Sequence, residues 1–372
     1  MKITRVELYG YDLHYTHGSY VMSNDRVVTA LPSTVVKLVA DSGEAGWGEV
    51  CPLGPAYLPA FAAGARAALS EIAPALLGLN PCNLGLINGR MDAVLRGHNY
   101  AKSPVDVACW DLLGKVTNCS VSTLLGGVHQ AQYPVYVPVS LGSAEEMAKF
   151  VAAKRAEGVH QFQLKIGGEP YDDKARVERV LAVTDERDTI IADANGGWTL
   201  PEAVVAARLL DSFPRVYLEQ PCASLEECLH VRRYTTLPMI LDEVITDTRS
   251  LLAAHREGGM EAINLKVSRV GGLTRAKLIR DLAQDLGLRL TIEDSWGGDI
   301  ATAAVSHLAA STASSALLTV SFMNDWVTEH VAGFQPRAHR GVGAVPNGPG
   351  LGVEVANDLL GQPILCVGEH EH

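Results

Sequence analysis

The segment TIIADANGGW, residues 189–198, contains a short apolar run that ends in an acidic residue, Asp193. A comparable run ending in a charged residue occurs in four further segments: FQLKIGG (162–168), VYLEQPC (216–222), PMILDEV (238–244) and AINLKVSRVGG (262–272). Each run has the length of a strand. In chain order, the charged residues that end the runs are Lys165, Asp193, Glu219, Asp242 and Lys266. Groups at the carboxyl ends of parallel barrel strands converge at one mouth, so these five side chains are predicted to share a site.

The sequence around these segments alternates between strand-like and helix-like patterns. YPVYVPVSL (133–141) is followed by the helical SAEEMAKFVAAKRAEG (143–158), and the alternation continues through RLTIEDSW (289–296) and ALLTVSFM (316–323). Eight strand-like runs lie between residues 133 and 323. Such alternation predicts an α/β fold with a parallel sheet and outer helices, and eight units favour a closed barrel over an open doubly wound sheet.

The first third of the chain has a different pattern. Two β-type runs within residues 1–50 flank turn residues at 41–43, and helical periodicity follows over residues 62–77 and 103–115. A chain of 372 residues also exceeds the roughly 250–300 residues of a single core. We therefore expect an α+β domain at 1–128, the barrel at 129–330 and a segment at 331–372 that returns to the first domain.

Composition excludes several classes of function. The net charge of −11 disfavours nucleic acid or an anionic membrane surface as a partner. No apolar run reaches about 18 residues, the start lacks the order of a signal peptide, and we expect a cytoplasmic enzyme. The seven cysteines are scattered without a C-x-x-C pair, which predicts neither a disulfide framework nor a zinc site.

The three acidic residues Asp193, Glu219 and Asp242 are spaced by one strand-helix unit each. Carboxylate oxygens are hard ligands suited to Mg²⁺. Any one of them could instead cap the following helix, but three in register on adjacent strands favour a metal site. Glu243 follows Asp242 directly, and alternation along a strand predicts that only one of the two faces the mouth.

Lys165 and Lys266 belong to the second and sixth strand-like runs, which face each other across an eight-strand ring. Their ammonium groups can then approach opposite faces of a substrate, as proton transfer on one carbon requires. A lysine that acts as a base needs its pKa lowered from about 10.4 toward about 7–8, and burial and a nearby divalent ion act in that direction. A single lysine at a strand end is otherwise a surface charge.

These residues and their motifs resemble the enolase superfamily, specifically its muconate-lactonizing-enzyme-like subgroup. The resemblance extends over almost the whole chain, through SPVDVACWDLLGK (103–115), LLGG (124–127), DANGGW, EQP, LDE, KVSRVGG and EDSWGGD. It implies a modified (β/α)₈ barrel with an N-terminal α+β capping domain. It also implies that Asp193, Glu219 and Asp242 bind Mg²⁺, and that Lys165 and Lys266 form an acid/base pair acting on the α-proton of a carboxylate.

One position departs from the subgroup. Its second strand usually reads K-x-K, whereas this chain has Gln163 in place of the first lysine, so a cationic substrate would meet less repulsion. The phrases GHNYAK (97–102), KIGG and DSWGGDI resemble members that act on proline-like imino acids, namely hydroxyproline dehydratases and proline betaine epimerases. Near the eighth strand, Met323 is the nearest match to the tryptophan expected around a quaternary ammonium, which favours a free secondary amine.

Two further residues are candidates for substrate contact. Asp294 ends the seventh run and could meet a ring ammonium, or else cap the next helix. Tyr57, in the proline-rich CPLGPAYLP (51–59), could reach over the mouth from the capping domain or lie partly buried at the surface. Together with Gln163, they are the residues expected to contact the substrate.

The sequence leads us to expect a Mg²⁺-dependent dehydratase of cis-3-hydroxy-L-proline, a lyase acting on a small proline-type imino acid. A 2-epimerase or racemase of 4-hydroxyproline or proline betaines would use the same lysines without a leaving group. A catalytically silent binding protein is a third alternative, although no metal ligand or lysine is lost. We also expect a homo-oligomer.

Overall fold

The computed structural model describes residues 1–24 and 26–368. Its largest sheet has eight parallel strands in the order β14-β13-β12-β11-β10-β9-β8-β7, which follows the chain. The strands are β7 (Val137–Val139), β8 (Gln161–Lys165), β9 (Thr189–Asp193), β10 (Val216–Glu219), β11 (Met239–Leu241), β12 (Ala262–Lys266), β13 (Arg289–Glu293) and β14 (Leu317–Val320). A parallel bridge between Val135, two residues before β7, and Val320 of β14 closes the ring. The predicted barrel is confirmed.

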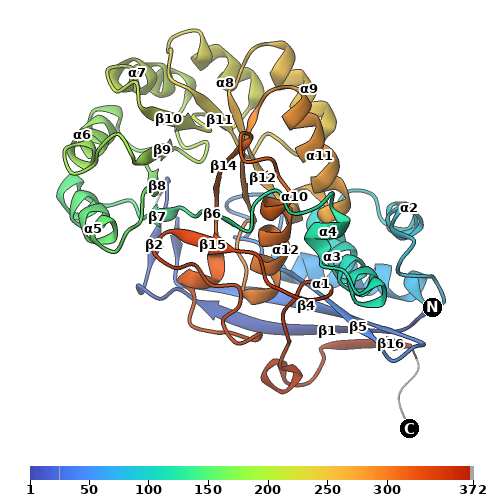
Figure 1. The fold of residues 1–372 in the computed structure, drawn as a ribbon. Coiled ribbons are helices and arrows are strands. Elements are labelled where there is room, and N and C mark those ends of the chain that lie inside the picture. Colours follow the sequence, from blue (N-terminus) through green and yellow to red (C-terminus); the bar gives the residue numbers. More distant parts are fainter. Residues whose placement is uncertain (25, 369–372) are drawn as a thin grey trace.

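Helices cover the outside of this ring (Figure 1). They are α5 (Ala144–Ala156), α6 (Pro170–Leu181), α7 (Leu200–Leu210), α8 (Leu225–Arg232), α9 (Thr248–Arg256), α10 (Val267–Val270), α11 (Leu273–Asp285) and α12 (Asp299–Ala310). Capping boxes begin α5, α7, α8 and α9. The barrel is modified because β14 is followed by a 3₁₀ turn, η2 (Met323–Trp326), instead of an α-helix.

The capping domain is built on an antiparallel sheet in the order β16-β1-β4-β5. Its strands are β1 (Ile3–His14), β4 (Ala30–Ala40), β5 (Ala45–Val50) and β16 (Leu365–Gly368). Arg5 pairs with Gly368 and Leu8 with Leu365, so the end of the described chain lies beside its beginning (Figure 1). The expected boundaries near residues 128 and 330 remain predictions.

Four helices complete this domain: α1 (Ala62–Ile72), α2 (Leu84–Val94), α3 (Asn99–Thr117) and α4 (Val121–Leu124). The helix expected over 62–77 is shorter, because Pro74 lacks an N–H donor and residues Ala73–Leu76 form a 3₁₀ turn, η1. α3 packs closely on β5 at Gly48, where a Cβ would lie 1.9 Å from the carbonyl oxygen of Pro104.

Short elements connect the two domains. Between β1 and β4 lies a small hairpin of β2 (Tyr20–Val21) and β3 (Val27–Val28). β6 (Gln132–Pro134) pairs with β15 (Val342–Ala344) from the C-terminal segment, and η3 (Asn357–Leu360) precedes β16. This segment therefore contacts first the barrel and then the capping sheet.

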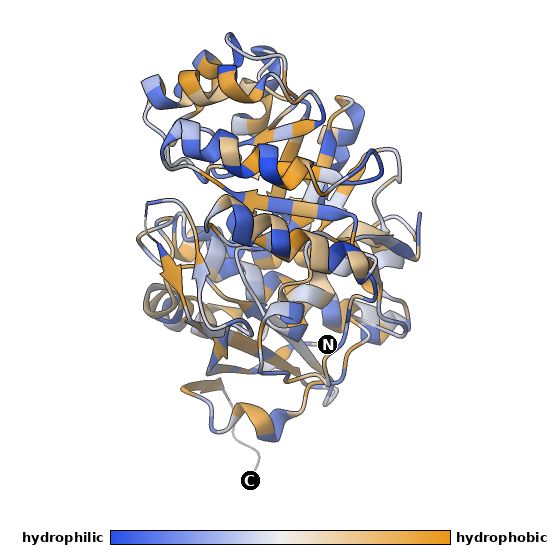
Figure 2. Ribbon diagram, turned by 90° about the vertical axis from the view of Figure 1, so that its left-hand side faces the viewer, coloured by the Kyte–Doolittle hydropathy of each residue, from blue (hydrophilic) through white to orange (hydrophobic). Residues whose placement is uncertain are grey.

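The hydrophobic core lies between the barrel strands and their helices. Phe162, Leu164, Ile190 and Leu265 are fully buried there. In Figure 2 the central strands are mostly orange, while the surrounding helices carry both orange and blue residues. The polar residues of the same strands point inward, because successive strand residues face opposite sides.

Candidate active site

The five charged strand-end residues lie together at the carboxyl end of the barrel. Lys165, Asp193, Glu219 and Lys266 are the last residues of β8, β9, β10 and β12, and Asp242 follows β11 directly. All five are buried, with at most 5% of any residue exposed. The strands of the two lysines are four positions apart in the eight-strand order, which places the lysines on opposite sides of the ring.

Each lysine pairs with a carboxylate from a neighbouring strand. Lys165 Nζ lies 2.5 Å from Asp193, and Lys266 Nζ lies 2.7 Å from Asp242. Burial alone would lower the pKa of both lysines, but the adjacent carboxylates outweigh it and raise the pKa above the usual value. The pKa values of the two lysines therefore shift in the direction opposite to the one expected. The sequence did not indicate that each lysine contacts a carboxylate directly.

Glu219 occupies the centre of the site. It accepts hydrogen bonds from Gln163 Nε2 at 2.9 Å and from Asn264 Nδ2 at 2.8 Å. Burial, followed by the nearby charges of Asp193 and Asp242, raises the pKa of Glu219 well above its ordinary value. Gln163 thus points into the site, but its partner is a carboxylate of the protein.

The expectation that only one of Asp242 and Glu243 faces the mouth is wrong. The hydroxyl of Tyr57 lies 3.4 Å from Asp242 and donates to Glu243 at 2.5 Å, so both carboxylates reach the same group. β11 ends at Leu241, and strand alternation does not continue past that residue. Burial would raise the pKa of Asp242, but Arg269 at 2.6 Å and Lys266 outweigh it and lower the pKa.

Tyr57 reaches the mouth from the capping domain. Besides its contacts with Asp242 and Glu243, its hydroxyl lies 3.2 Å from Lys266 Nζ. Burial, followed by the charge of Glu243, raises the pKa of Tyr57 well above the ordinary value, so the phenol stays protonated. The loop that carries Tyr57 therefore covers the mouth on the side of Lys266.

Asp294 lines the same small cavity as the two lysines. Its carboxylate accepts hydrogen bonds from Ser268 N at 3.0 Å, from the Ser268 hydroxyl and from Ser295 N at 2.7 Å. These donors lie outside α12, so Asp294 does not cap that helix. Burial raises the pKa of Asp294 to about 6.

Several residues of the site were missed by sequence reasoning. Glu293, the true last residue of β13, lies 3.1 Å from Lys266 and accepts a hydrogen bond from Asn264 at 2.8 Å. The strand-end rule could have found it, but it was applied one residue too late, to Asp294. Asn264 and Arg269 gave no signal in the sequence, because their importance depends on contacts with other strands.

The aromatic lining also differs from the expectation at the eighth strand. Met323 is buried against Ser321, whereas Trp326, three residues further on, lines the mouth cavity together with Trp296 and Tyr20. The Trp296 and Trp326 ring centroids are 5.5 Å apart. The turn η2 places the Trp326 side chain at the mouth. The match of Met323 to the expected tryptophan position did not indicate this.

The donor set fits a divalent ion. Glu219, Asp193 and Asp242 offer only oxygen atoms, and burial together with the charges of Asp193 and Asp242 raises the pKa of Glu219. Buried oxygens of Asn195, Glu243 and Asn264 also lack hydrogen-bond partners. Within residues 1–24 and 26–368, no three acidic, histidine or cysteine side chains converge closely enough to hold an ion. Asp193 and Asp242 pair with the lysines, and Glu219 accepts hydrogen bonds from Gln163 and Asn264.

Comparisons with known proteins agree with this arrangement. The mandelate racemase / muconate lactonizing enzyme N-terminal domain matches residues 14–126, and the enolase C-terminal domain-like family matches residues 146–359. The chain therefore belongs to the enolase superfamily, as the sequence motifs predicted.

Individual relatives extend this result. A cis-3-hydroxy-L-proline dehydratase from Roseibium aggregatum is 46% identical over 98% of this chain and 99% of its own. An N-succinyl-L-Arg/Lys racemase from Bacillus cereus is 28% identical over 83% of this chain and 84% of its own. An enolase superfamily member from Roseovarius nubinhibens, whose structure is complexed with magnesium, has a TM-score of 0.92 and is 37% identical over 99% of this chain and 100% of its own.

None of the helices within 1–24 and 26–368 combines the length and the apolar character needed to cross a bilayer.

Proposed function

We propose that this protein is a Mg²⁺-dependent dehydratase of cis-3-hydroxy-L-proline. The observation that carries the proposal is the placement of Lys165 and Lys266 on opposite sides of a buried three-carboxylate site. The 46% identity over nearly the full length to a dehydratase of this substrate supports it.

In this proposal Asp193, Glu219 and Asp242 hold the ion. When bound, Mg²⁺ would stabilise the negative charge that develops on the substrate carboxylate as the α-proton leaves. Lys165 pairs with Asp193 and Lys266 with Asp242, so each lysine must turn away from its carboxylate to reach the substrate.

One lysine removes the α-proton, and a lysine protonates the departing 3-hydroxyl. The Cα–H and C3–O bonds break, a C=C bond forms between Cα and C3, and one water leaves. The resulting enamine tautomerises to a cyclic imine without any oxidant. Tyr57 and the aromatic side chains of the mouth exclude water during these steps.

Substrate charge sets a second requirement. The neutral amide of Gln163 avoids repelling a ring ammonium, and Asp294 is the proposed anionic partner of that ammonium. Trp296 and Trp326 offer aromatic faces to the same cation. Gln163→Lys would place a positive charge near the ring nitrogen and should raise KM for the imino acid.

Proton NMR in D₂O with purified protein and cis-3-hydroxy-L-proline tests the proposal. Loss of the signal of the proton on C3 with appearance of cyclic imine signals is expected. Deuterium incorporation at the α-carbon with the hydroxyl retained would instead identify a 2-epimerase. The aromatic side chain of Trp326 at the mouth favours this second candidate more than the sequence did, because an aromatic face also suits a quaternary betaine.

A silent binding protein makes a different prediction. If the site neither binds metal nor performs chemistry, added Mg²⁺ should leave the melting temperature unchanged, whereas an ion that binds only the folded state raises it. A Mg²⁺-dependent rise that is lost in Glu219→Gln would exclude the silent alternative.

A further inference from the structure

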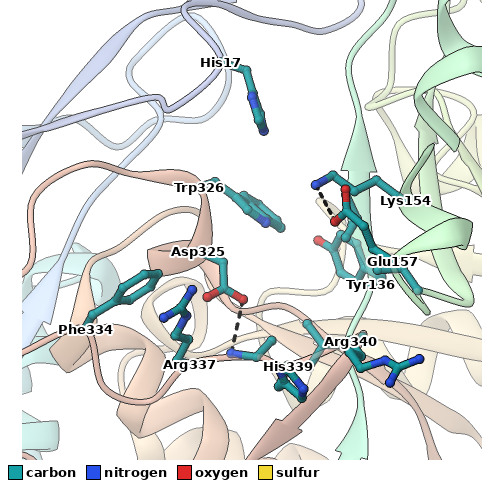
Figure 3. Close-up of a pocket in the computed structure, with 15 residues that line it drawn as sticks. His17, Tyr136, Lys154, Glu157, Asp325, Trp326, Phe334, Arg337, His339 and Arg340 are labelled. Atoms are coloured by element: carbon teal, nitrogen blue, oxygen red, sulfur yellow. Dashed lines mark hydrogen bonds and ion pairs between the residues drawn. The ribbon is translucent and has the colours of Figure 1, made fainter.

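A second cavity, larger than the mouth, shares Tyr136 and Trp326 with it, and Figure 3 shows the residues around this second cavity. Its volume is about 370 Å³, compared with about 30 Å³ for the cavity between the lysines. The larger volume lies in the range of small-molecule sites. The catalytic proposal gives this cavity no role.

The cavity is lined by two arginines without carboxylate partners. Arg337 and Arg340 form no ion pair with any residue in 1–24 or 26–368. The other cation, Lys154, is neutralised by Glu157 at 2.9 Å. Burial raises the pKa of Asp325 to about 7, so this carboxyl offsets only part of the arginine charge. On a chain with a net charge of −11, such a local excess of positive charge favours an anionic ligand.

The segment that carries Arg337 is held in place from inside the molecule. Buried Asp299 accepts hydrogen bonds from Ala332 N at 2.8 Å and Phe334 N at 3.2 Å. Buried Asn324 donates to Asp299 at 2.9 Å and to the carbonyl of Pro336 at 2.6 Å. A site whose backbone is fixed before binding loses less entropy when a ligand arrives.

The walls of the cavity add flat apolar surface to this charge. Trp326 and Phe334 both line it. The Phe334 ring is stacked on His330 at 3.8 Å and lies 4.7 Å from the Arg337 guanidinium, so Phe334 helps to hold Arg337 and Trp326 supplies the flat surface. Figure 3 shows Trp326 between His17, Asp325 and the Lys154–Glu157 pair. Arg340 lies at the tip of the tight turn in which His339 N donates to Val342 O at 2.8 Å.

We propose that this cavity binds a small aromatic or heteroaromatic carboxylate, with its ring against Trp326 and its carboxylate on Arg337, while Arg340 adds positive charge on the other side of His339. A carboxylate suits a guanidinium because two parallel N–H groups can bind both oxygens. Tyr136 and Trp326 line both cavities, so the bound molecule lies directly behind the mouth.

Calorimetric titration of the full chain with benzoate, at low ionic strength, tests the proposal. We expect saturable binding that weakens at least tenfold in the double variant Arg337→Gln/Arg340→Gln. Both arginines are exposed, so the fold should survive the change. Arg249→Gln, at an exposed arginine on α9, removes a comparable charge elsewhere and should leave the affinity unchanged.

Further titrations show where the bound molecule lies. Lys165→Met changes the mouth alone and should leave benzoate affinity unchanged, whereas Phe334→Leu should weaken it, because it removes the ring that holds Arg337 in place. Inorganic phosphate should bind more weakly than benzoate, because it cannot use the aromatic wall. Absence of saturable binding, an unchanged affinity in the double arginine variant, an equal loss in Lys165→Met, or phosphate binding as tightly as benzoate would each overturn the proposal.

Discussion

The strands β8 and β12 carry the same pattern on opposite sides of the barrel, an amide, a leucine and a lysine. Gln163 and Asn264 both donate to Glu219, at 2.9 and 2.8 Å, and Lys165 and Lys266 both pair with a neighbouring carboxylate. Alternation along each strand points the amide and the lysine inward. Glu219 on β10 therefore lies at the centre of two nearly equivalent halves.

The β8 half (Gln163 and Lys165) and the β12 half (Asn264 and Lys266) differ in the number of residues that they contact. Asn264 and Lys266 both contact Glu293 as well, and Lys266 also contacts Tyr57 from the capping domain. Lys165 has one carboxylate partner among the described residues, Asp193. The same strand pattern thus gives a more constrained lysine on β12 and a less constrained one on β8.

The largest expected effect comes from Asp242→Asn, which removes the main partner of Lys266 and one charge from the proposed metal shell. Turnover should fall to background, while the unfolding transition stays cooperative because the barrel core does not include this side chain. Turnover assays and Mg²⁺-dependent melting measure both results. The matched variant Glu243→Gln should lose less, and near wild-type turnover in Asp242→Asn would identify Glu243 as the ligand.

Replacing the lysines one at a time separates the two halves. Lys165→Ala and Lys266→Ala should each lower turnover by about 10²- to 10⁴-fold, the usual contribution of a general acid or base. Each variant should still exchange the α-proton of one enantiomer of a proline-type acid in D₂O, and the retained enantiomer should differ between them. Proton NMR follows the exchange. Survival of exchange in both enantiomers would contradict the two-lysine mechanism, whereas loss of all exchange in both variants would show that the lysines act as one unit.

Replacing the side-chain amides of Gln163 and Asn264 tests the difference in the number of contacts between the two halves. Gln163→Met leaves Glu219 without one donor, whereas Asn264→Leu removes a donor from both Glu219 and Glu293. Each lost donor to a buried group costs about 1–3 kcal/mol, so Asn264→Leu should lower the free energy of unfolding about twice as much. Urea unfolding without Mg²⁺ measures this. Equal losses in the free energy of unfolding would mean that the hydrogen bond from Asn264 to Glu293 does not contribute to stability.

The smallest effect is expected at Tyr57, in the loop of residues 51–59 from the capping domain. Tyr57→Phe removes a hydroxyl that contacts Lys266 but not Lys165, and kcat/KM should fall about fivefold, as for the loss of one hydrogen bond of ~1 kcal/mol. Tyr20→Phe is the control, because Tyr20 lines the same cavity without a hydrogen bond from its hydroxyl to the described residues. A similar fall in both variants would indicate a general packing effect.

The barrel and the five charged strand ends could be predicted from sequence because the relation is local. A short apolar run followed by one charged group defines both a strand and the direction of its last side chain. Lys165, Asp193, Glu219, Asp242 and Lys266 all follow this rule.

The remaining residues depend on contacts between strands or across loops. Glu243 reaches Tyr57 because the chain leaves β11 at Leu241, and Trp326 reaches the mouth because η2 turns the backbone. Neither change of direction follows from residue spacing. The roles proposed for Tyr57, Gln163 and Asp294 rest on the geometry of the mouth.

The pairing of β16 with β1 has a consequence for biosynthesis. β1 leaves the ribosome before the barrel, but its neighbour on one side, residues 365–368, follows the entire barrel. Domains generally fold as units while the chain is made, and here the capping sheet cannot gain its fourth strand until the barrel has been synthesised. The edge of β1 stays open to other strands during that interval, so truncation before residue 365 should promote aggregation even though every residue of the proposed catalytic site is present.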